Sequence, residues 1–302
     1  MRLVEGIFAA AIAPRRSTGH EIDLALLFEV IDFLCAKKVE GIALFGATGE
    51  YIHFGLEERV RVAQLAVKRS RAPLLVNASH SNLDGAVMLA EEAAAAGAAG
   101  VLLMPPHFFR YSQLEVREYF LEFSKAVRAD IPIYLYNVPF FTSEIAPETA
   151  CQLLGTGKFA GIKDSSGRED YFAALMRQKE MTPFIRVILG NDSLFTRGRS
   201  GGADGVISGV CCGLPELMLA LNRAIVESNE ARRDLLQARL VEYIGWLDRF
   251  PVPIGVRETV ALRGLKVGPQ ALPFSPDTAR TMGEFREWFK AWLPELLRET
   301  SF

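Results

Sequence analysis

The chain has 302 residues, a formal net charge of −2 and 50% hydrophobic residues, values typical of a globular protein with a substantial core. Acidic and basic residues are nearly balanced and interspersed, so we expect neither a nucleic-acid partner nor a membrane partner.

Short apolar runs alternate with segments of helical periodicity up to about residue 228, which is typical of repeated βα units. The runs are apolar throughout, as expected for parallel strands buried on both faces. The predicted strands are Gly6–Ala13, Glu40–Phe45, Pro73–Ala78, Gly100–Met104, Ile131–Asn137, Phe159–Asp164, Arg186–Gly190 and Gly205–Ser208. The predicted helices are Leu24–Lys37, Leu56–Arg69, Asn82–Ala96, Gln113–Val127, Ala146–Leu154, Glu169–Gln178, Leu194–Arg199 and Leu214–Glu227.

Eight βα units are the number that closes a parallel barrel inside a ring of helices. A doubly wound open sheet is the alternative, but no glycine-rich dinucleotide motif follows the first strand. We therefore predict an α/β fold, a (β/α)8 TIM barrel over residues 1–228, with a C-terminal helical extension over residues 229–302.

The extension is predicted to hold three helices, Arg232–Arg249, Val256–Leu265 and Asp277–Leu297, separated by proline-containing segments. Its three tryptophans, Trp246, Trp288 and Trp292, are interpreted as packing anchors rather than as a stack for a cofactor.

Four cysteines, Cys35, Cys151, Cys211 and Cys212, form no CxxC pair and lie in apolar segments, where free thiols pack as small hydrophobes. This usage indicates a reducing, cytoplasmic compartment. The four histidines lie far apart in the sequence, so no protein-bound metal is predicted.

The segment Phe159 to Gly167 places Lys163 near the end of the sixth predicted strand. Burial disfavours the charged form of a lysine, lowers its pKa and makes its amine a nucleophile toward carbonyl groups. The alternative is a lysine that extends to water or pairs with Asp164.

Function in a TIM barrel gathers at the C-terminal ends of the strands, where other polar residues also lie. After the second strand, the backbone N–H groups of Gly46-Ala47-Thr48-Gly49-Glu50 and the Thr48 hydroxyl can converge on an anion such as a carboxylate. Tyr136, at the end of the fifth strand, can donate and accept a proton beside the lysine. An ordinary tight turn and a tyrosine that fills the barrel are the alternatives, but the three features together predict a Schiff-base site for a 2-oxo acid.

Three motifs carry a family resemblance: Gly46-Ala47-Thr48-Gly49-Glu50, Tyr136-Asn137-Val138-Pro139 and Gly161-Ile162-Lys163-Asp164-Ser165-Ser166-Gly167. In this order and spacing they resemble the N-acetylneuraminate lyase and dihydrodipicolinate synthase superfamily over practically the whole chain. The resemblance implies a (β/α)8 barrel, usually a homotetramer, whose lysine forms an imine with pyruvate or with the pyruvyl end of a longer keto acid.

The resemblance also implies roles for individual residues. Lys163 would form the Schiff base and Tyr136 would relay protons. Thr48 and the amides of Ala47 and Thr48 would hold the carboxylate, and the Ile207 carbonyl would form part of the pocket wall. No cofactor is implied beyond the covalent imine with Lys163.

The sequence departs from the dihydrodipicolinate synthases at three of these places. These enzymes carry an arginine where Phe141 stands, a hydroxyl residue at Ala47, and a tyrosine lent by a neighbouring subunit where Phe108 stands. A phenyl ring cannot hold the carboxylate of an aldehyde substrate as an arginine does. Whether Arg110 or Arg168 replaces that arginine stays open.

We therefore expect a class I, metal-independent lyase or aldolase that cleaves, or forms, a 2-oxo-3-deoxy acid from pyruvate and an aldehyde. Phe108, Phe140 and Phe141 near the mouth are compatible with an aliphatic or aromatic aldehyde, and Tyr51, His53 and His107 are candidates for polar contacts. One alternative is a 4-hydroxy-tetrahydrodipicolinate synthase or keto-deoxy-acid dehydratase of the same family. The other is a non-catalytic homologue that binds pyruvate but has lost its proton relay.

Overall fold

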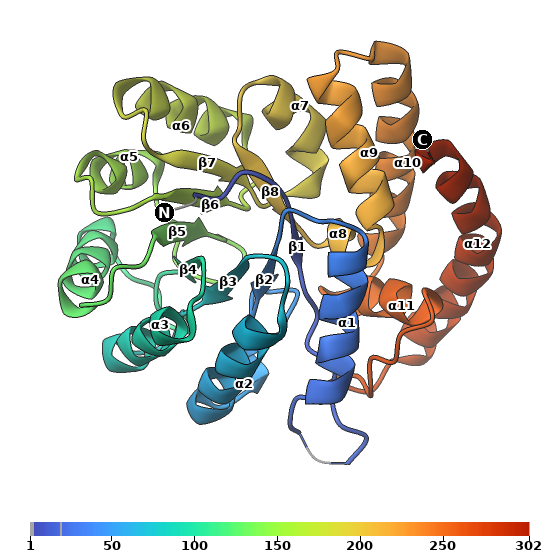
Figure 1. Ribbon diagram of the computed structural model, residues 1–302, viewed down its shortest axis with the longest axis horizontal. Helices are drawn as coiled ribbons and strands as arrows, with labels where there is room; N and C mark the ends of the chain where they lie inside the picture. Colours follow the sequence, from blue (N-terminus) through green and yellow to red (C-terminus); the bar gives the residue numbers. More distant parts are fainter. Residues whose placement is uncertain (1–2, 19, 302) are drawn as a thin grey trace.

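The computed structural model describes residues 3–18 and 20–301. Eight parallel strands follow one another in sequence order and close into a barrel, because β8 pairs with β1 (Figure 1). The strands are β1 (Gly6–Ala10), β2 (Gly41–Leu44), β3 (Leu74–Asn77), β4 (Gly100–Leu103), β5 (Ile133–Asn137), β6 (Gly161–Asp164), β7 (Arg186–Leu189) and β8 (Gly205–Ser208). The predicted (β/α)8 TIM barrel is thereby confirmed.

Helices surround the barrel on the outside, as Figure 1 shows. They are α1 (Leu24–Ala36), α2 (Leu56–Arg69), α3 (Leu83–Ala96), α4 (Gln113–Ala126), α5 (Pro147–Gly155), α6 (Glu169–Met181), α7 (Phe195–Ser200), α8 (Val210–Gly213) and α9 (Pro215–Val226). The short helix α8 and two 3-10 turns, η1 (Tyr51–His53) and η2 (Asp192–Leu194), were not predicted. Each has three or four residues, which is too short for a helical period to show in the sequence.

The strands are apolar throughout because the barrel interior and the helix layer bury both of their faces. β1 ends at Ala10, earlier than the predicted Ala13, although the Ala11 N–H still donates to the Ala43 carbonyl at 3.0 Å. The segment beyond β1 is apolar because it is buried, so an apolar run by itself does not mark the end of the strand.

Local signals fix several helix ends. Ser112 and Glu115 form a capping box at the start of α4, Pro147 occupies the first turn of α5, and Gly97 ends α3 in a left-handed conformation with φ of 90°.

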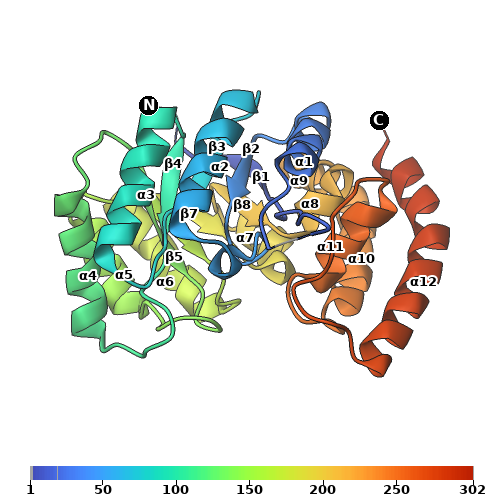
Figure 2. The same ribbon diagram turned by 90° about the horizontal axis from the view of Figure 1, so that it is seen from below.

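The C-terminal extension consists of α10 (Glu230–Leu247), α11 (Ile254–Leu262) and α12 (Pro276–Thr300). These helices lie together at one side of the barrel, beside α8 and α9 (Figures 1 and 2). The three predicted helices are confirmed with shifted bounds. α10 begins at Glu230 because the Asn229 side chain accepts from the Arg232 N–H at 3.1 Å. The predicted boundary after residue 228 falls between α9 and α10 and stays a prediction.

The tryptophans of the extension pack on one another, as predicted. Ring centroids are 5.3 Å apart for Trp246 and Trp288 and 4.8 Å apart for Trp288 and Trp292. The Glu242 carboxylate accepts from the indole N–H groups of Trp288 and Trp292 at 3.3 and 2.7 Å. This cluster joins α10 to α12.

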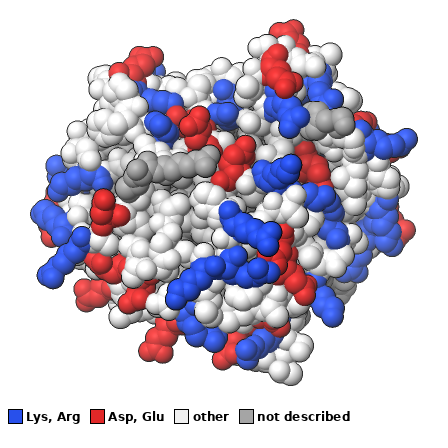
Figure 3. Space-filling view, viewed as in Figure 1, with Lys and Arg blue, Asp and Glu red and all other residues white. Residues whose placement is uncertain are grey.

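On the face of the molecule shown in Figure 3, acidic and basic side chains are intermixed. Within residues 3–18 and 20–301, no helix combines the length and the apolar character needed to cross a membrane.

Candidate active site

A cavity of about 390 Å³ opens at the C-terminal ends of the strands, a size typical of small-molecule sites. The barrel contributes one side, which includes Ala47, Thr48, Tyr136, Lys163 and Ile207. The C-terminal extension contributes the opposite wall, with residues between Ile244 and Val256. The cavity therefore needs both parts of the chain.

Lys163 and Tyr136 lie side by side on the cavity floor. They are register partners on β6 and β5, so both side chains point to the same face of the sheet. Lys163 is only 4% exposed, and its Nζ lies 4.0 Å from the centroid of the Tyr136 ring. In the described part of the chain, no ion pair joins Lys163 to a carboxylate. The amine is thus held by an aromatic face rather than by an acid.

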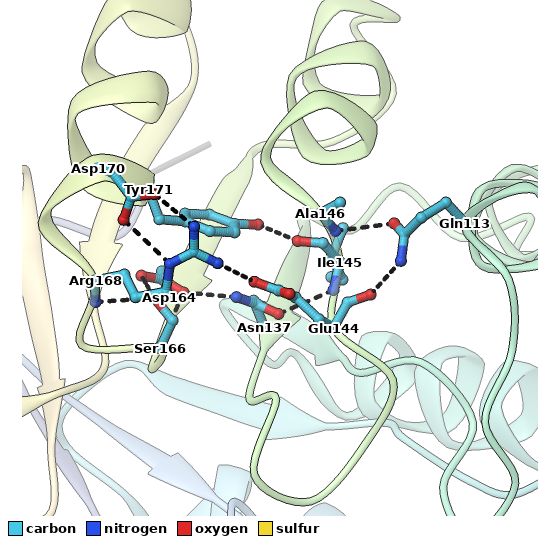
Figure 4. Close-up of polar contacts among 10 residues, drawn as sticks. All are labelled: Gln113, Asn137, Glu144, Ile145, Ala146, Asp164, Ser166, Arg168, Asp170 and Tyr171. Atoms are coloured by element: carbon cyan, nitrogen blue, oxygen red, sulfur yellow. Dashed lines mark hydrogen bonds and ion pairs between the residues drawn. The ribbon is translucent and has the colours of Figure 1, made fainter.

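Asp164 points away from the cavity, because successive residues of a strand face opposite sides. Its carboxylate accepts from Asn137 Nδ2 at 2.8 Å, from the Ser166 N–H at 3.1 Å and from the Ser166 hydroxyl at 2.7 Å (Figure 4). Burial raises the pKa of Asp164, and the hydrogen bonds from Ser166 and Asn137 oppose that shift. The alternative in which Asp164 pairs with Lys163 is therefore wrong.

The same network fixes the loop that follows β5. Asn137 Oδ1 accepts from the Ile145 N–H at 3.0 Å, and the Tyr171 hydroxyl donates to the Ile145 carbonyl at 2.6 Å. The Gln113 side chain bonds the carbonyl of Glu144 and the N–H of Ala146 (Figure 4). This loop carries Phe140 and Phe141, which line the cavity, so the contacts behind the sheet position part of its wall.

The Gly46–Glu50 turn presents two backbone N–H groups to the cavity. The N–H groups of Gly49 and Glu50 close the turn by donating to Gly46 and Ala47 at 3.0 and 3.1 Å. Among the hydrogen bonds of the described residues, none uses the N–H of Ala47 or Thr48, and both residues line the cavity. The turn can therefore offer two amides and the Thr48 hydroxyl to an anion.

Two strained residues bracket this turn. Phe45 and Glu50 have φ values of 62° and 49°, in the left-handed region that residues with a Cβ rarely adopt. Asn77 Nδ2 holds the Phe45 carbonyl at 2.6 Å, and the Glu50 carboxylate lies 3.3 Å from Arg15 Nη2 and 3.1 Å from Arg257 Nη1. Sequence reasoning missed both arginines, since each is far from Glu50 along the chain.

Asp192 is a further cavity residue to which the sequence assigned no role, although it lies two residues after the seventh predicted strand, Arg186–Gly190. Its Oδ2 accepts from the Val210 N–H at 3.3 Å, whereas its buried Oδ1 finds no hydrogen-bond partner among the described residues. Burial raises the pKa of Asp192, while the neighbouring Ser208 hydroxyl, the Val210 N–H and the positive charge of Lys163 oppose that shift. A carboxylate thus lies within electrostatic reach of the lysine.

The other predicted site residues lie in different places. Phe141 lines the cavity, but Phe108 is 87% exposed and is not among the lining residues of the single chain. The Tyr51 hydroxyl lies 3.2 Å from His107 Nδ1, and His53 Nδ1 lies 2.6 Å from Arg15 Nη2. None of these last three candidates for polar contacts lines the cavity.

Neither Arg110 nor Arg168 takes the place of an arginine at position 141. Arg110 donates to the Thr142 carbonyl. Arg168 donates to Glu144 at 2.9 Å and to Asp170 at 3.1 Å, on the side of β6 away from the cavity (Figure 4). Both guanidinium groups are engaged, and neither residue lines the cavity.

The fold is that of a TIM-barrel protein with a cavity at the C-terminal ends of its strands, where TIM-barrel enzymes carry their active sites. The model of the dihydrodipicolinate synthetase family matches residues 3–291, so the chain belongs to that family. The resemblance seen in the three motifs is thereby confirmed.

The proteins that are similar to this chain include both a synthase and a probable aldolase. A 4-hydroxy-tetrahydrodipicolinate synthase of Methanosphaerula palustris is 30% identical over 90% of this chain and 93% of its own. A probable 2-dehydro-3-deoxy-D-pentonate aldolase, YjhH of Escherichia coli, is 29% identical over 78% of this chain and 80% of its own. The solved dihydrodipicolinate synthase of Aquifex aeolicus matches with a TM-score of 0.88 at 26% identity, over 96% of this chain and 98% of that one.

Proposed function

We propose that this protein is a Schiff-base-forming aldolase that cleaves, or forms, a 2-oxo-3-deoxy acid from pyruvate and an aldehyde, without a metal or other cofactor. The observation that carries the proposal is Lys163, a buried cavity lysine with an aromatic neighbour and no acidic ion-pair partner in the described chain. Membership of a family with both synthases and an aldolase among the named relatives supports it.

The chemistry begins with attack of the Lys163 amine on the ketone carbon, and loss of water gives a protonated imine. The imine withdraws electrons from the bond between carbons three and four. Tyr136 donates its phenol proton to the hydroxide that is lost in imine formation. The resulting phenolate accepts the proton of the hydroxyl on carbon four as the bond between carbons three and four breaks, and the aldehyde leaves. Protonation and hydrolysis of the remaining enamine release pyruvate and restore the lysine.

The Gly46–Glu50 turn would bind the carboxylate of the keto acid. The N–H groups of Ala47 and Thr48 and the Thr48 hydroxyl are the donors, and the Ile207 carbonyl lies in the adjoining wall. Left-handed residues on either side hold the turn in place before substrate arrives, which limits the reorganisation that binding requires.

The 4-hydroxy-tetrahydrodipicolinate synthase reaction is the second candidate, because the relative from Methanosphaerula palustris carries that name. That reaction needs a cation for a second carboxylate, which Phe141 cannot supply. A keto-deoxy-acid dehydratase would use the same lysine but release no pyruvate. A non-catalytic pyruvate binder would form the imine and turn nothing over.

Pyruvate release from a set of 2-oxo-3-deoxy acids tests the proposal. Wild type should release pyruvate with at least one of them, and Lys163→Ala should not. Lys158→Ala, which removes an exposed lysine just before β6, is the matched control and should behave as wild type. Substrate consumption without pyruvate would instead favour the dehydratase, and imine formation without any turnover would favour the binder.

We also propose a homo-oligomer, a tetramer by the family resemblance, in the cytoplasm. Phe108, Phe109, Phe140 and Phe141 are exposed aromatic residues on two loops that pair with each other at His107 and Thr142. Exposed apolar surface of this kind supports association of copies. Analytical ultracentrifugation at micromolar concentration distinguishes a tetramer from a dimer or a monomer.

A further inference from the structure

The charges that line the cavity are asymmetric. Among the described lining residues, Lys163 is the sole cation, whereas Asp192 and Asp248 are acidic. In the proposed reaction Lys163 is committed to the keto acid, so no other described lining residue supplies a cation for the other half of the substrate.

The wall that faces this second half is largely apolar. It is formed by Phe140 and Phe141 of the loop after β5 and by Ile244, Leu247, Phe250 and Val252 of the extension. A carboxylate placed there would lose its hydration without gaining a charged partner, which disfavours binding.

The extension adds negative charge at this wall. α10 ends at Leu247, and its C-cap residue is Asp248. Ile244 and Leu247 line the cavity, so the negative end of the helix dipole lies at the same place as the Asp248 carboxylate. Both repel an anion.

The nearest arginine along the chain does not cancel this charge. Arg249 pairs with Glu284 at 2.8 Å, and its guanidinium lies 4.3 Å from the centroid of the Trp246 ring. It packs against α10 and α12 rather than lining the cavity. Arg110 donates to the Thr142 carbonyl and Arg168 to Glu144 and Asp170, and neither arginine lines the cavity.

We propose that the aldehyde half of the substrate is uncharged, and that Asp192, Asp248 and the end of α10 select against aldehydes that carry a carboxylate. Apolar carbons of the aldehyde would pack on Phe140, Leu247 and Phe250. This inference rests on the proposed function, which defines the two halves of the substrate.

A matched panel of aldehydes tests the inference in the direction of synthesis from pyruvate. Butanal and glyceraldehyde are uncharged, whereas succinic semialdehyde has the chain length of butanal and carries a carboxylate. We expect kcat/KM for the better uncharged aldehyde to exceed that for succinic semialdehyde by about tenfold or more.

Charge reversal at Asp248 should reduce the difference in kcat/KM between uncharged and anionic aldehydes. Asp248→Lys is expected to lower the ratio between the uncharged and anionic aldehydes by about fivefold or more. Asp234→Lys makes the same change on the same helix outside the cavity and should leave the ratio as in wild type.

The outcomes separate this inference from the function on which it rests. If wild type used succinic semialdehyde as well as the uncharged aldehydes, and Lys163→Ala abolished all turnover, the charge selection would be wrong and the aldolase reaction would stand. If no aldehyde gave a product that depends on Lys163, the proposed function would fail and the inference would fall with it. An unchanged ratio in Asp248→Lys would remove Asp248 from the selecting groups.

Discussion

Glu50 and Arg257 form a buried ion pair at 3.1 Å although 207 positions of sequence separate them. Glu50 ends the turn that is proposed to hold the carboxylate, and Arg257 lies on α11 of the C-terminal extension. Arg257 also donates to the carbonyls of Ala13, Val267 and Pro269 at 2.9, 2.7 and 3.0 Å. The extension therefore holds a cavity loop in place as well as forming a cavity wall.

Removal of this arginine should impair both stability and pyruvate binding. Arg257→Ala leaves the buried Glu50 with one cation fewer and frees three carbonyls, so the free energy of unfolding should fall by about 3–5 kcal/mol. The pyruvate KM should rise more than kcat falls, because the turn loses its support but Lys163 does not. Arg257→Lys keeps the charge but loses the several N–H donors of the guanidinium group. Its stability and its pyruvate KM should lie between those of wild type and Arg257→Ala.

Denaturant unfolding and steady-state kinetics measure these two effects. Arg280→Ala, which removes an exposed pair with Asp277, is the control and should change the unfolding free energy little. Wild-type stability in Arg257→Ala would show that the contact does not support the turn.

The absence of a side chain at Gly190 leaves space for the Lys163 side chain. A Cβ at this position would lie 2.1 Å from Ser165 Oγ and 2.8 Å from Lys163 Cε, closer than atoms can approach. Gly190→Ala should therefore displace the lysine and lower kcat by about tenfold or more while the fold persists. In the control, Gly245→Ala, a Cβ meets nothing within 4 Å, so activity should stay at the wild-type level. Full activity of Gly190→Ala would mean that Lys163 tolerates a different position.

Asp164 should affect the reaction indirectly, because its hydrogen bonds position the ends of β5 and β6 that carry Tyr136 and Lys163. Asp164→Ala removes the acceptor for Asn137 and Ser166, and buried donors left without partners cost about 1–3 kcal/mol of stability. The side chains of Lys163 and Tyr136 lie on the neighbouring positions, so kcat should fall while pyruvate still binds. Asp164→Asn keeps part of the hydrogen-bond network and should lose less stability and less kcat than Asp164→Ala. Equal kinetics in all three proteins would limit Asp164 to a structural role.

Asp192 should make stability depend on pH. Burial raises its folded-state pKa above the unfolded value, so the folded protein keeps this proton to a higher pH. Stability then falls as pH rises from the unfolded pKa through the folded one, and the ionised carboxylate is unfavourable at neutral pH. Asp192→Asn should therefore raise the Tm at neutral pH, with a gain that shrinks on acidification. A gain that is the same at every pH would contradict this shift.

The sequence was sufficient to predict the barrel because each strand is an apolar run bounded by a helix of clear period. Lys163 and Tyr136 were identifiable because each places a reactive side chain, an amine or a phenol, at the end of a predicted apolar strand. The Gly46–Glu50 turn was identifiable by its glycines and its place after β2.

Other parts of the site depend on contacts between distant segments. From the sequence, the segment between Ile244 and Val256 was predicted to be the end of one helix and a proline-containing connection. Only the packing of the extension against the barrel brings this segment to the cavity. The burial of Asp192 depends on η2 and on the start of α8, which are too short to predict. Phe108 was expected near the mouth, but its direction depends on a loop conformation with φ of 82°, which no residue pattern indicates.

Borohydride reduction in the presence of pyruvate, followed by intact-mass and peptide mass spectrometry, tests the proposed role of Lys163 most directly. Borohydride converts an imine into a stable amine, so a trapped adduct records covalent catalysis by a particular residue. We predict one pyruvyl adduct per chain, located on Lys163 and absent from Lys163→Ala. A folded protein that gives no adduct, or gives one on another lysine, would contradict the Schiff-base mechanism.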